Sequence, residues 1–259
     1  MVLGFDIGNT NTVMGIYGES EKLPGKTYRY RTIGEHTTDE LGALVQGFLG
    51  LNGQVERSGA SVTGIAFSSV VPALNRRYSA MAEGFFGLKA LEITHKCRLS
   101  ITLCYDDPAR LGVDRIVNAE AALREYRRDC IIVDVGTATT FCVLHADGRY
   151  DGGLIGPGIG ITIDALSIKA SQLERITFGK PEKLVATSTV DALKSGFYYG
   201  WLSLVEGVIE RIERSYGSSF LSVITGGYGD MLGSALTRES IVDGLLTMKG
   251  IKFVYDLNK

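Results

Sequence analysis

Two segments combine an aspartate, a glycine and small hydroxyl or amide side chains, a set of groups suited to binding a phosphate chain. Residues 2–13 read Val-Leu-Gly-Phe-Asp-Ile-Gly-Asn-Thr-Asn-Thr-Val, and residues 131–141 read Ile-Ile-Val-Asp-Val-Gly-Thr-Ala-Thr-Thr-Phe. A carboxylate at a strand end can meet a hydrated cation, while the backbone N–H groups of a glycine turn can face phosphate oxygens. One such turn is ordinary, because Gly and Asn favour turns. Two copies half a chain apart indicate two turns that grip a phosphate chain across a cleft.

A third glycine-rich segment, residues 223–229, follows an apolar run and precedes a predicted helix. It matches neither the Walker phosphate loop nor the G-x-G-x-x-G dinucleotide pattern. Its sequence permits two interpretations, a nucleotide-binding turn or a plain connection from strand to helix.

Between the two aspartate segments, an aspartate and an arginine stand side by side at a predicted helix start. Pro108 interrupts regular structure and Gly112 permits a turn into a helix that begins at Asp114. The Asp114 carboxylate could accept a proton from a hydroxyl while the Arg115 guanidinium holds an anion. Alternatively, Asp114 caps the helix and Arg115 pairs on the surface, and the residue types alone favour this second reading.

The elements that must position these groups alternate between strands and helices. Each aspartate segment predicts a strand, a tight turn and a returning strand. Thr37 and Glu40 fit a capping box before an amphipathic helix, a second helix is predicted over 114–129, and a third runs over about 190–215 with Thr189 as its cap. The apolar positions expected on one face of the third helix are Leu193, Phe197, Trp201, Leu204, Val208 and Ile212.

Two glycines on adjacent turns of the third helix, Gly196 and Gly200, permit close backbone approach. Packing inside the core is favoured over a contact between subunits, but the sequence leaves both open.

Composition limits the class of protein. The chain has 259 residues, 45% of them hydrophobic, and a net charge of −2, which provides no general attraction to nucleic acid or to an anionic membrane. We expect no signal peptide and no membrane span, because no apolar run is long enough. The four cysteines are expected to be buried, reduced thiols of a cytosolic protein, with Cys130 and Cys142 in or beside predicted strands. The three histidines lack metal-ligand spacing.

The order of the short motifs along nearly the whole chain resembles that of type III pantothenate kinases, members of the actin-like ATPase superfamily. The motifs occupy residues 6–11, 68–72, 112–115, 134–140, 152–158 and 225–227. The resemblance implies an α/β protein of two duplicated ribonuclease-H-like or actin-like domains with a nucleotide cleft between them. We place these domains at residues 1–115 and 116–259. The glycine-rich stretch 152–158 is expected to be irregular backbone near the cleft.

The resemblance also implies roles for individual residues. Asp114 would be the proton acceptor, Asp134 would help to bind a monovalent cation, and Thr137 would contact ATP. The first turn would bind ATP through Asp6, Ile7, Gly8, Asn9, Thr10, Asn11, Thr12 and Val13. The substrate would be bound by Tyr105, Gly112, Val113, Asp114, Arg115 and Thr189.

The activity that this family performs is ATP-dependent phosphorylation of pantothenate to 4′-phosphopantothenate, the first step of coenzyme A biosynthesis. We therefore expect a cytoplasmic, homodimeric transferase that uses potassium, or ammonium in its place, and Mg²⁺ with ATP, and that binds neither nucleic acid nor a membrane. The alternatives are another actin-like small-molecule kinase or phosphatase, or a nucleotide-responsive regulator without kinase activity.

Two positions depart from the family's pattern. Asp107 stands where Asn is common, which adds negative charge near a site for an anionic substrate and is expected to weaken its binding. Residues 171–174 lack the proline that often follows the corresponding leucine. Neither departure removes a group to which the resemblance assigns chemistry.

Overall fold

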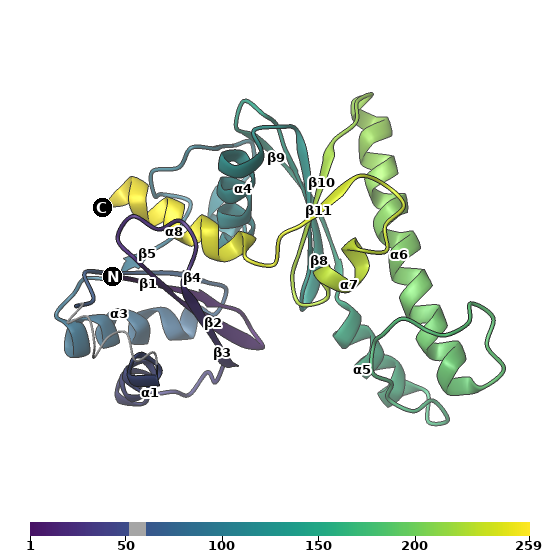
Figure 1. Cartoon of the computed structure of the whole chain (residues 1–259), viewed down its shortest axis with the longest axis horizontal. Helices are drawn as coiled ribbons and strands as arrows, with labels where there is room; N and C mark the ends of the chain where they lie inside the picture. The colour runs from purple at the N-terminus through teal and green to yellow at the C-terminus, as the bar shows by residue number, and fades with distance from the viewer. Residues whose placement is uncertain (52–60) are drawn as a thin grey trace. The chain divides into compact units, whose positions relative to one another are not determined.

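The computed structural model describes residues 1–51 and 61–259, which form two compact units with one β-sheet in each (Figure 1). Unit 1 comprises Met1–Ile101, Tyr105–Arg124 and Leu245–Lys259, and unit 2 comprises Thr102–Cys104 and Glu125–Gly244. The division of the sequence into duplicated domains at residues 115 and 116 stays a prediction, because compactness does not test where a duplication begins.

The sheet of unit 1 has five strands in the order β3-β2-β1-β4-β5. Its strands are β1 (Val2–Ile7), β2 (Asn11–Tyr17), β3 (Lys26–Arg31), β4 (Gly64–Ser69) and β5 (Leu91–Glu92). The first three strands pair antiparallel as a meander, whereas β4 runs parallel to β1 on its other side. The turn after β1 and the end of β4 therefore lie side by side, at the carboxyl ends of these two strands.

The sheet of unit 2 has six strands in the order β11-β10-β7-β8-β9-β6. Its strands are β6 (Thr102–Leu103), β7 (Cys130–Val135), β8 (Ala138–Leu144), β9 (Arg149–Pro157), β10 (Leu221–Thr225) and β11 (Ser240–Val242). Strands β7, β8 and β9 form an antiparallel meander, and β10 runs parallel to β7.

The two sheets repeat the same topology, and this confirms the predicted duplication of the two aspartate segments. Strands β1, β2, β3, β4 and β5 correspond in order to β7, β8, β9, β10 and β11. Asp6 lies opposite Val13 on β2 and beside Ser68 on β4. Asp134 lies at the matching position, opposite Thr140 on β8 and beside Thr225 on β10. Each aspartate is thus the last residue but one of a central strand.

The helices of unit 1 cover both faces of its sheet, because successive side chains of a strand point to opposite faces. Helices α1 (Thr38–Leu51) and α3 (Pro72–Phe86) pack on the face that carries Leu3 and Phe5. Helices α4 (Val113–Tyr126) and α8 (Leu246–Asn258) pack on the face that carries Val2.

The predicted capping box is confirmed at the start of α1. The Glu40 amide donates to Thr37 Oγ1 (3.2 Å), and the Thr37 amide donates to Glu40 Oε2 (2.7 Å). The predicted helix over 114–129 is α4, which begins one residue earlier and ends three residues earlier than expected.

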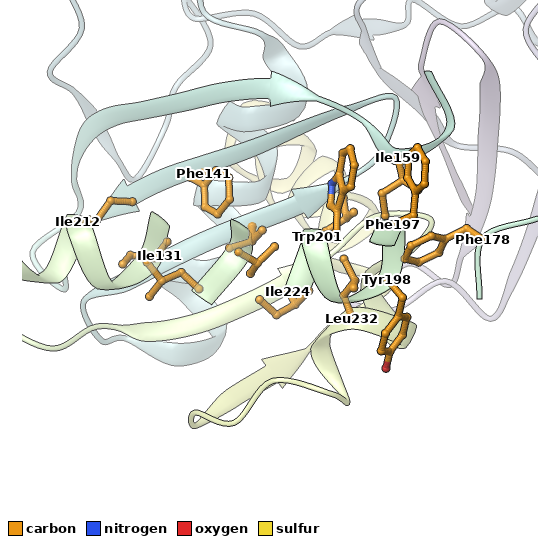
Figure 2. Packing of buried hydrophobic residues seen from close by; sticks show 14 of the residues in the cluster. Ile131, Phe141, Ile159, Phe178, Phe197, Tyr198, Trp201, Ile212, Ile224 and Leu232 are labelled. Carbon is orange, nitrogen blue, oxygen red and sulfur yellow. The ribbon is translucent and has the colours of Figure 1, made fainter. Parts of the chain in front are cut away.

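The core of unit 2 lies between its sheet and α5 (Ile159–Lys169), α6 (Thr189–Tyr216) and the short α7 (Gly229–Gly233). Figure 2 shows Phe197 and Trp201 of α6 beside the strands, with their rings stacked at 5.8 Å. The predicted third helix is confirmed, but Ser188 rather than Thr189 is its cap, since Ser188 Oγ accepts from the Asp191 amide (3.2 Å).

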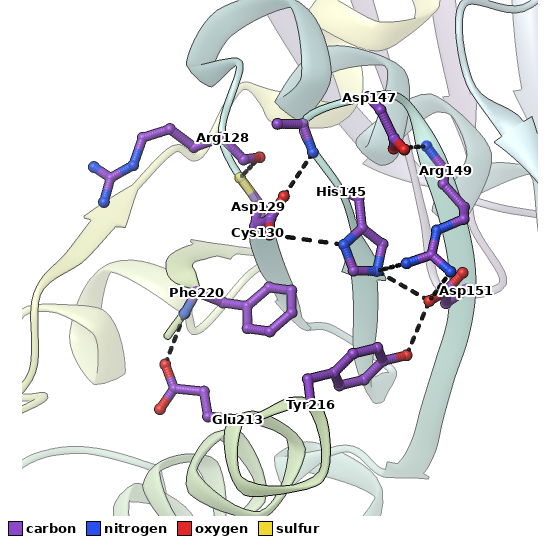
Figure 3. Close-up of polar contacts among 11 residues, drawn as sticks. Arg128, Asp129, Cys130, His145, Asp147, Arg149, Asp151, Glu213, Tyr216 and Phe220 are labelled. Carbon is purple, nitrogen blue, oxygen red and sulfur yellow. Dashed lines mark hydrogen bonds and ion pairs between the residues drawn. The ribbon is translucent and has the colours of Figure 1, made fainter. Parts of the chain in front are cut away.

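A polar cluster beside the start of β7 and the end of β8 joins these strands and β9 to the last turn of α6 (Figure 3). His145 Nε2 lies 3.0 Å from Asp151 Oδ2, which also accepts a hydrogen bond from the Tyr216 hydroxyl (3.1 Å). Asp129 lies 3.7 Å from His145 Nδ1. Within residues 1–51 and 61–259, no group of three or more His, Cys, Asp or Glu side chains has an arrangement that could hold a metal ion.

The stretch 152–158 is not the irregular backbone that the sequence led us to expect. Residues 152–157 belong to β9, which pairs along β8 with a register shift at Val143 and Leu144, and Gly158 is the cap of the helix that follows. Gly152 and Gly153 have φ angles of 91° and 152°, and a Cβ on Gly153 would overlap the Phe141 carbonyl. Glycines here permit a bulged strand to lie against its neighbour, because they tolerate positive φ without a side-chain clash.

Two further expectations concern the cysteines and the hydrophobic segments. All four cysteines are free, and Cys130 and Cys142 are buried in β7 and β8, as expected. The expectation of burial is wrong for Cys104, which is exposed, and Cys97 is only partly buried. Among the helices that the structure describes, none has the length and hydropathy of a membrane span.

Helix α8 approaches α4 closely at Gly250, and this contact predicts a specific loss of stability. A Cβ on Gly250 would overlap the carbonyl oxygen of Val117, whereas one on the exposed Gly47 of α1 would meet no atom within 4 Å. We expect Gly250→Ala to lower the free energy of unfolding by about 1–3 kcal/mol. Gly47→Ala should leave it unchanged or raise it by about 0.5–1 kcal/mol, because alanine is the better helix former. Thermal and urea unfolding of both variants measure this, and equal stabilities would contradict the proposed contact.

Candidate active site

The first turn, between β1 and β2, carries a row of accessible polar groups. It is closed by a hydrogen bond from the Gly8 amide to the Asn11 carbonyl (3.1 Å). The side chains of Asn9, Thr10 and Asn11 are exposed, while Asp6 is only partly buried at the strand end. The Thr10 carbonyl accepts from the Thr32 amide (3.0 Å), which fixes the turn against the residue after β3. The predicted ATP-binding residues 6–13 thus share one hairpin.

The second turn, between β7 and β8, is one residue shorter. The Gly136 amide donates to the Ala138 carbonyl (3.0 Å), and Thr137 is exposed at the tip. Thr139 is buried behind the tip, and its hydroxyl lies 3.4 Å from Trp201 Nε1. The hairpin is therefore supported by the core of unit 2, while its tip is open to a ligand.

The third glycine-rich segment packs directly on the second turn. Gly226 has a φ of 93°, and a Cβ there would lie 2.6 Å from the Val135 amide nitrogen and still closer to Asp134 Oδ1. The Tyr228 amide donates to the Val135 carbonyl (3.2 Å). A Cβ on Gly158 would overlap the Gly136 and Thr137 carbonyls. Sequence reasoning missed this convergence, because only contacts in three dimensions reveal it.

Asp114 and Arg115 occupy the first turn of α4. The Asp114 carboxylate accepts from the Arg115 amide (2.9 Å), and a Cβ on Gly112 would lie 2.5 Å from Asp114 Oδ1. Burial raises the pKa of the Asp114 carboxyl, although the Arg115 amide and guanidinium partly oppose that rise. A carboxylate that water does not fully stabilise is a stronger base, so the site suits proton abstraction.

Arg115 is not the surface residue that its type alone suggested. It is 4% exposed, and its guanidinium carbon lies 6.0 Å from the centre of the Tyr105 ring. Val113 is buried beside it at the start of α4. The structure therefore brings together five of the six predicted substrate-binding residues, which are Tyr105, Gly112, Val113, Asp114 and Arg115.

Asp107, which stands where the family commonly has Asn, caps a short helix. Its Oδ1 accepts from the Ala109 amide (3.1 Å) and caps the short helix η1 (Pro108–Arg110). Asparagine can make the same hydrogen bond, so the fold does not require the charge.

The remaining predicted residue, Thr189, lines an apolar groove of about 590 Å³ along α6. Gly196 and Gly200 also line this groove, are exposed, and have no atom within 4 Å of a built Cβ. Leu204, predicted on the apolar face of this helix, is 38% exposed there. Within the described chain, core packing therefore does not explain the two glycines.

Comparison with known sequences identifies one family. The family model for type III pantothenate kinases matches residues 2–211. A type III pantothenate kinase of Brevibacillus brevis is 39% identical over 259 residues, which cover 100% of both chains. One from Koribacter versatilis is 38% identical over 267 residues, which cover 100% of this chain and 96% of that protein.

Comparison with solved structures supports the fold. A protein from Campylobacter jejuni, described as a Baf family transcriptional activator, has a TM-score of 0.60 at 20% identity over 98% of this chain and 97% of its own. The ROK family glucokinase of Streptomyces griseus, solved with glucose and AMPPNP, has a TM-score of 0.58 at 12% identity over 99% and 98%. At such identities the likeness concerns the fold, an actin-like pair of α/β domains.

The contact between Gly226 and Asp134 predicts different outcomes for two adjacent glycines. Gly226→Ala should cost roughly 1–3 kcal/mol of stability, because it adds both positive-φ strain and a clash with the end of β7. Gly227 has no atom within 4 Å of a built Cβ, so Gly227→Ala should stay within about 0.5 kcal/mol of the unchanged protein. Thermal unfolding compares them, and a stable Gly226→Ala protein would refute the packing described above.

Proposed function

The chain belongs to the family of type III pantothenate kinases, and we propose how its residues divide the work of ATP-dependent phosphorylation of pantothenate. The family match and identities of 35–39% across whole chains carry the activity. The product is 4′-phosphopantothenate, and the reaction opens coenzyme A biosynthesis. The role of each residue below is the proposal.

Asp114 is the proposed base. Its carboxylate takes the proton of the pantothenate hydroxyl as the hydroxyl oxygen bonds to the γ-phosphorus of ATP and the bond to ADP breaks. The raised pKa of this carboxyl favours proton abstraction. Arg115, held beside Tyr105, binds the pantothenate carboxylate, and Gly112 and Val113 complete the pocket. Thr189 is a further proposed contact to the substrate.

The proposed ATP site uses the two hairpin turns. Residues 6–13 and Thr137 offer backbone amides and hydroxyls to the phosphates. Phosphoryl transfer depends mainly on alignment and charge neutralisation, so such donors matter more than a strong nucleophile. ATP acts with a divalent metal, for which we propose Mg²⁺ bound to the phosphates.

A monovalent cation, potassium or ammonium, is the proposed partner of Asp134. The surroundings fit such an ion, because glycines at 136 and 226 keep side chains away from Asp134 Oδ1; a Cβ on Gly136 would lie 3.3 Å from it. One carboxylate amid backbone carbonyls is a weak set of donors for a divalent ion, which prefers several carboxylates. The cation would supply positive charge near the phosphates.

We also propose a homodimer in the cytoplasm. The apolar groove along α6, with its exposed Gly196, Gly200 and Leu204, suits close contact with a second copy of the chain. The free cysteines agree with a reducing compartment.

The two alternatives have weaker support. Another small-molecule kinase would rest on the likeness to glucokinase, and a regulator would rest on the Baf-family protein; both likenesses concern the fold. A purely regulatory role would also not explain why Asp114 and Arg115 are buried side by side at the start of α4.

The proposed function predicts that the purified protein transfers phosphate from ATP to pantothenate but not to simple sugars or acetate. Asp114→Asn should lower kcat about 100- to 10,000-fold, because an amide cannot accept the proton. ATP binding and folding should be kept. A coupled assay with a substrate panel, together with calorimetric ATP binding, measures both. Absence of pantothenate phosphorylation would refute the activity, and normal turnover by Asp114→Asn would refute the base.

The raised pKa of Asp114 also fixes the sign of a pH effect on stability. Above the ordinary aspartate pKa of about 4, the unfolded chain releases this proton before the folded chain does. Asp114 therefore costs stability as pH rises through this window. The same Asp114→Asn protein should be more stable than the unchanged one at neutral pH, with the difference shrinking as pH falls towards 4.

The cation assignment predicts the salt dependence of a third variant. Asp134→Asn should raise the KM for ATP and reduce the difference in rate between potassium and sodium, since the carboxylate that binds the cation is lost. Initial rates at matched ionic strength in KCl, NH₄Cl and NaCl test this. Undiminished potassium activation would exclude Asp134 as the ligand.

A further inference from the structure

Glu120, in the middle of α4, is a fully buried carboxylate without a role in the reaction described above. Its relative exposure is 0%. Oε1 accepts hydrogen bonds from two successive backbone amides, those of Ser100 and Ile101, the latter at 3.0 Å. Oε2 is buried and accepts no hydrogen bond from the described residues. Burying a carboxylate is costly, so its paired amide bonds mark a fixed attachment of this segment to α4.

The attached segment leads to the substrate-binding residue Tyr105. Only three residues lie between Ile101 and Tyr105, so the four steps of an extended chain span at most about 14 Å between them. The position of Ile101 therefore limits where the Tyr105 ring can lie. That ring meets Arg115, five residues before Glu120 on the same helix. Helix α4 thus holds both ends of the segment, one through Glu120 and the other through Arg115.

We propose that Glu120 is a positioning residue for the pantothenate pocket. By holding the amides of Ser100 and Ile101, it sets the position of Tyr105 against Arg115, and through them the fit of the substrate. The inference rests on the proposed function, because it presumes that Tyr105 and Arg115 bind pantothenate. Glu120 itself touches neither substrate, and it acts on substrate binding rather than on the chemical step.

The test compares three substitutions of Glu120 that differ in whether, and how closely, their side chain can accept hydrogen bonds from the amides of Ser100 and Ile101. Glu120→Met has a similar length but accepts no strong hydrogen bond, and it should raise the KM for pantothenate about tenfold with kcat and the KM for ATP within about twofold. Glu120→Gln keeps an accepting oxygen and should stay within about twofold of the unchanged enzyme. Glu120→Asp, one methylene shorter, should lie between them.

A matched control separates positioning from general loss of stability. Glu213 of α6 also accepts a backbone hydrogen bond from a loop, the Phe220 amide at 2.9 Å, and pairs with Arg238. Glu213→Met should lower the melting temperature without changing the KM for pantothenate. In a Tyr105→Ala background, Glu120→Met should add no further increase in KM, because both changes act on one contact.

The outcomes distinguish this inference from the proposed function. If the unchanged protein does not phosphorylate pantothenate, the proposed function fails. If it does, but Glu120→Met leaves the KM for pantothenate unchanged, or Glu213→Met raises it equally, the inference is overturned. Should Glu120→Met fail to fold, Glu120→Asp decides, and an unchanged pantothenate KM in that variant overturns the inference.

Discussion

Close backbone packing at the end of β7 is the constraint that fixes the neighbouring turns of unit 2. Asp134 stands there with its carboxylate against Gly226, while the carbonyls of the following turn lie against Gly158. Two chain segments thus contact one strand end and its turn, and each does so through a glycine, Gly226 or Gly158. Dense packing at the end of β7 holds the Asp134 carboxylate in a fixed position. It also holds the peptide groups of the following turn in a fixed orientation. The core between α6 and the sheet supports this point from behind, through Trp201 and Thr139.

Helix α4 shows how function and stability oppose each other within one element. Asp114, Arg115 and Glu120 bring three charged groups into or towards the interior, although burial disfavours charge. Two of them are the proposed chemical groups, and the third binds backbone amides. Natural enzymes often accept such costs at sites where a preorganised environment is needed. If Asp114 and Arg115 have the proposed roles, the first turn of α4 gives up stability for reactivity.

The sequence allowed the two hairpins, β1–β2 and β7–β8, to be anticipated because the repeat of Asp-x-Gly segments is local and nearly identical in pattern. The capping box at Thr37 and the long helix α6 were predictable for the same reason. The strand β9 was not, since a glycine-rich stretch contains no hydrophobic alternation and becomes regular only when β8 supplies its partner. The burial of Arg115 and the exposure of Leu204 likewise depend on tertiary neighbours, which residue types do not specify. The packing of Gly226 and Gly158 around the strand end at Asp134 could not be predicted, because the spacing of these residues in the sequence does not indicate which of them touch.

The C-terminal helix α8 completes unit 1, whose sheet begins with residue 2. Met248 and Ile251 pack with Val2, and the Tyr17 hydroxyl donates to the Met248 carbonyl (2.7 Å) across 231 residues of sequence. During synthesis from the N-terminus, the face of the first sheet that carries Val2 is therefore covered only in part, by α4, until residues 246–258 have been made. Unit 2, whose segments lie within residues 102–244, can finish its core earlier. A chain truncated before residue 246 would therefore lack the helix that completes the unit made first.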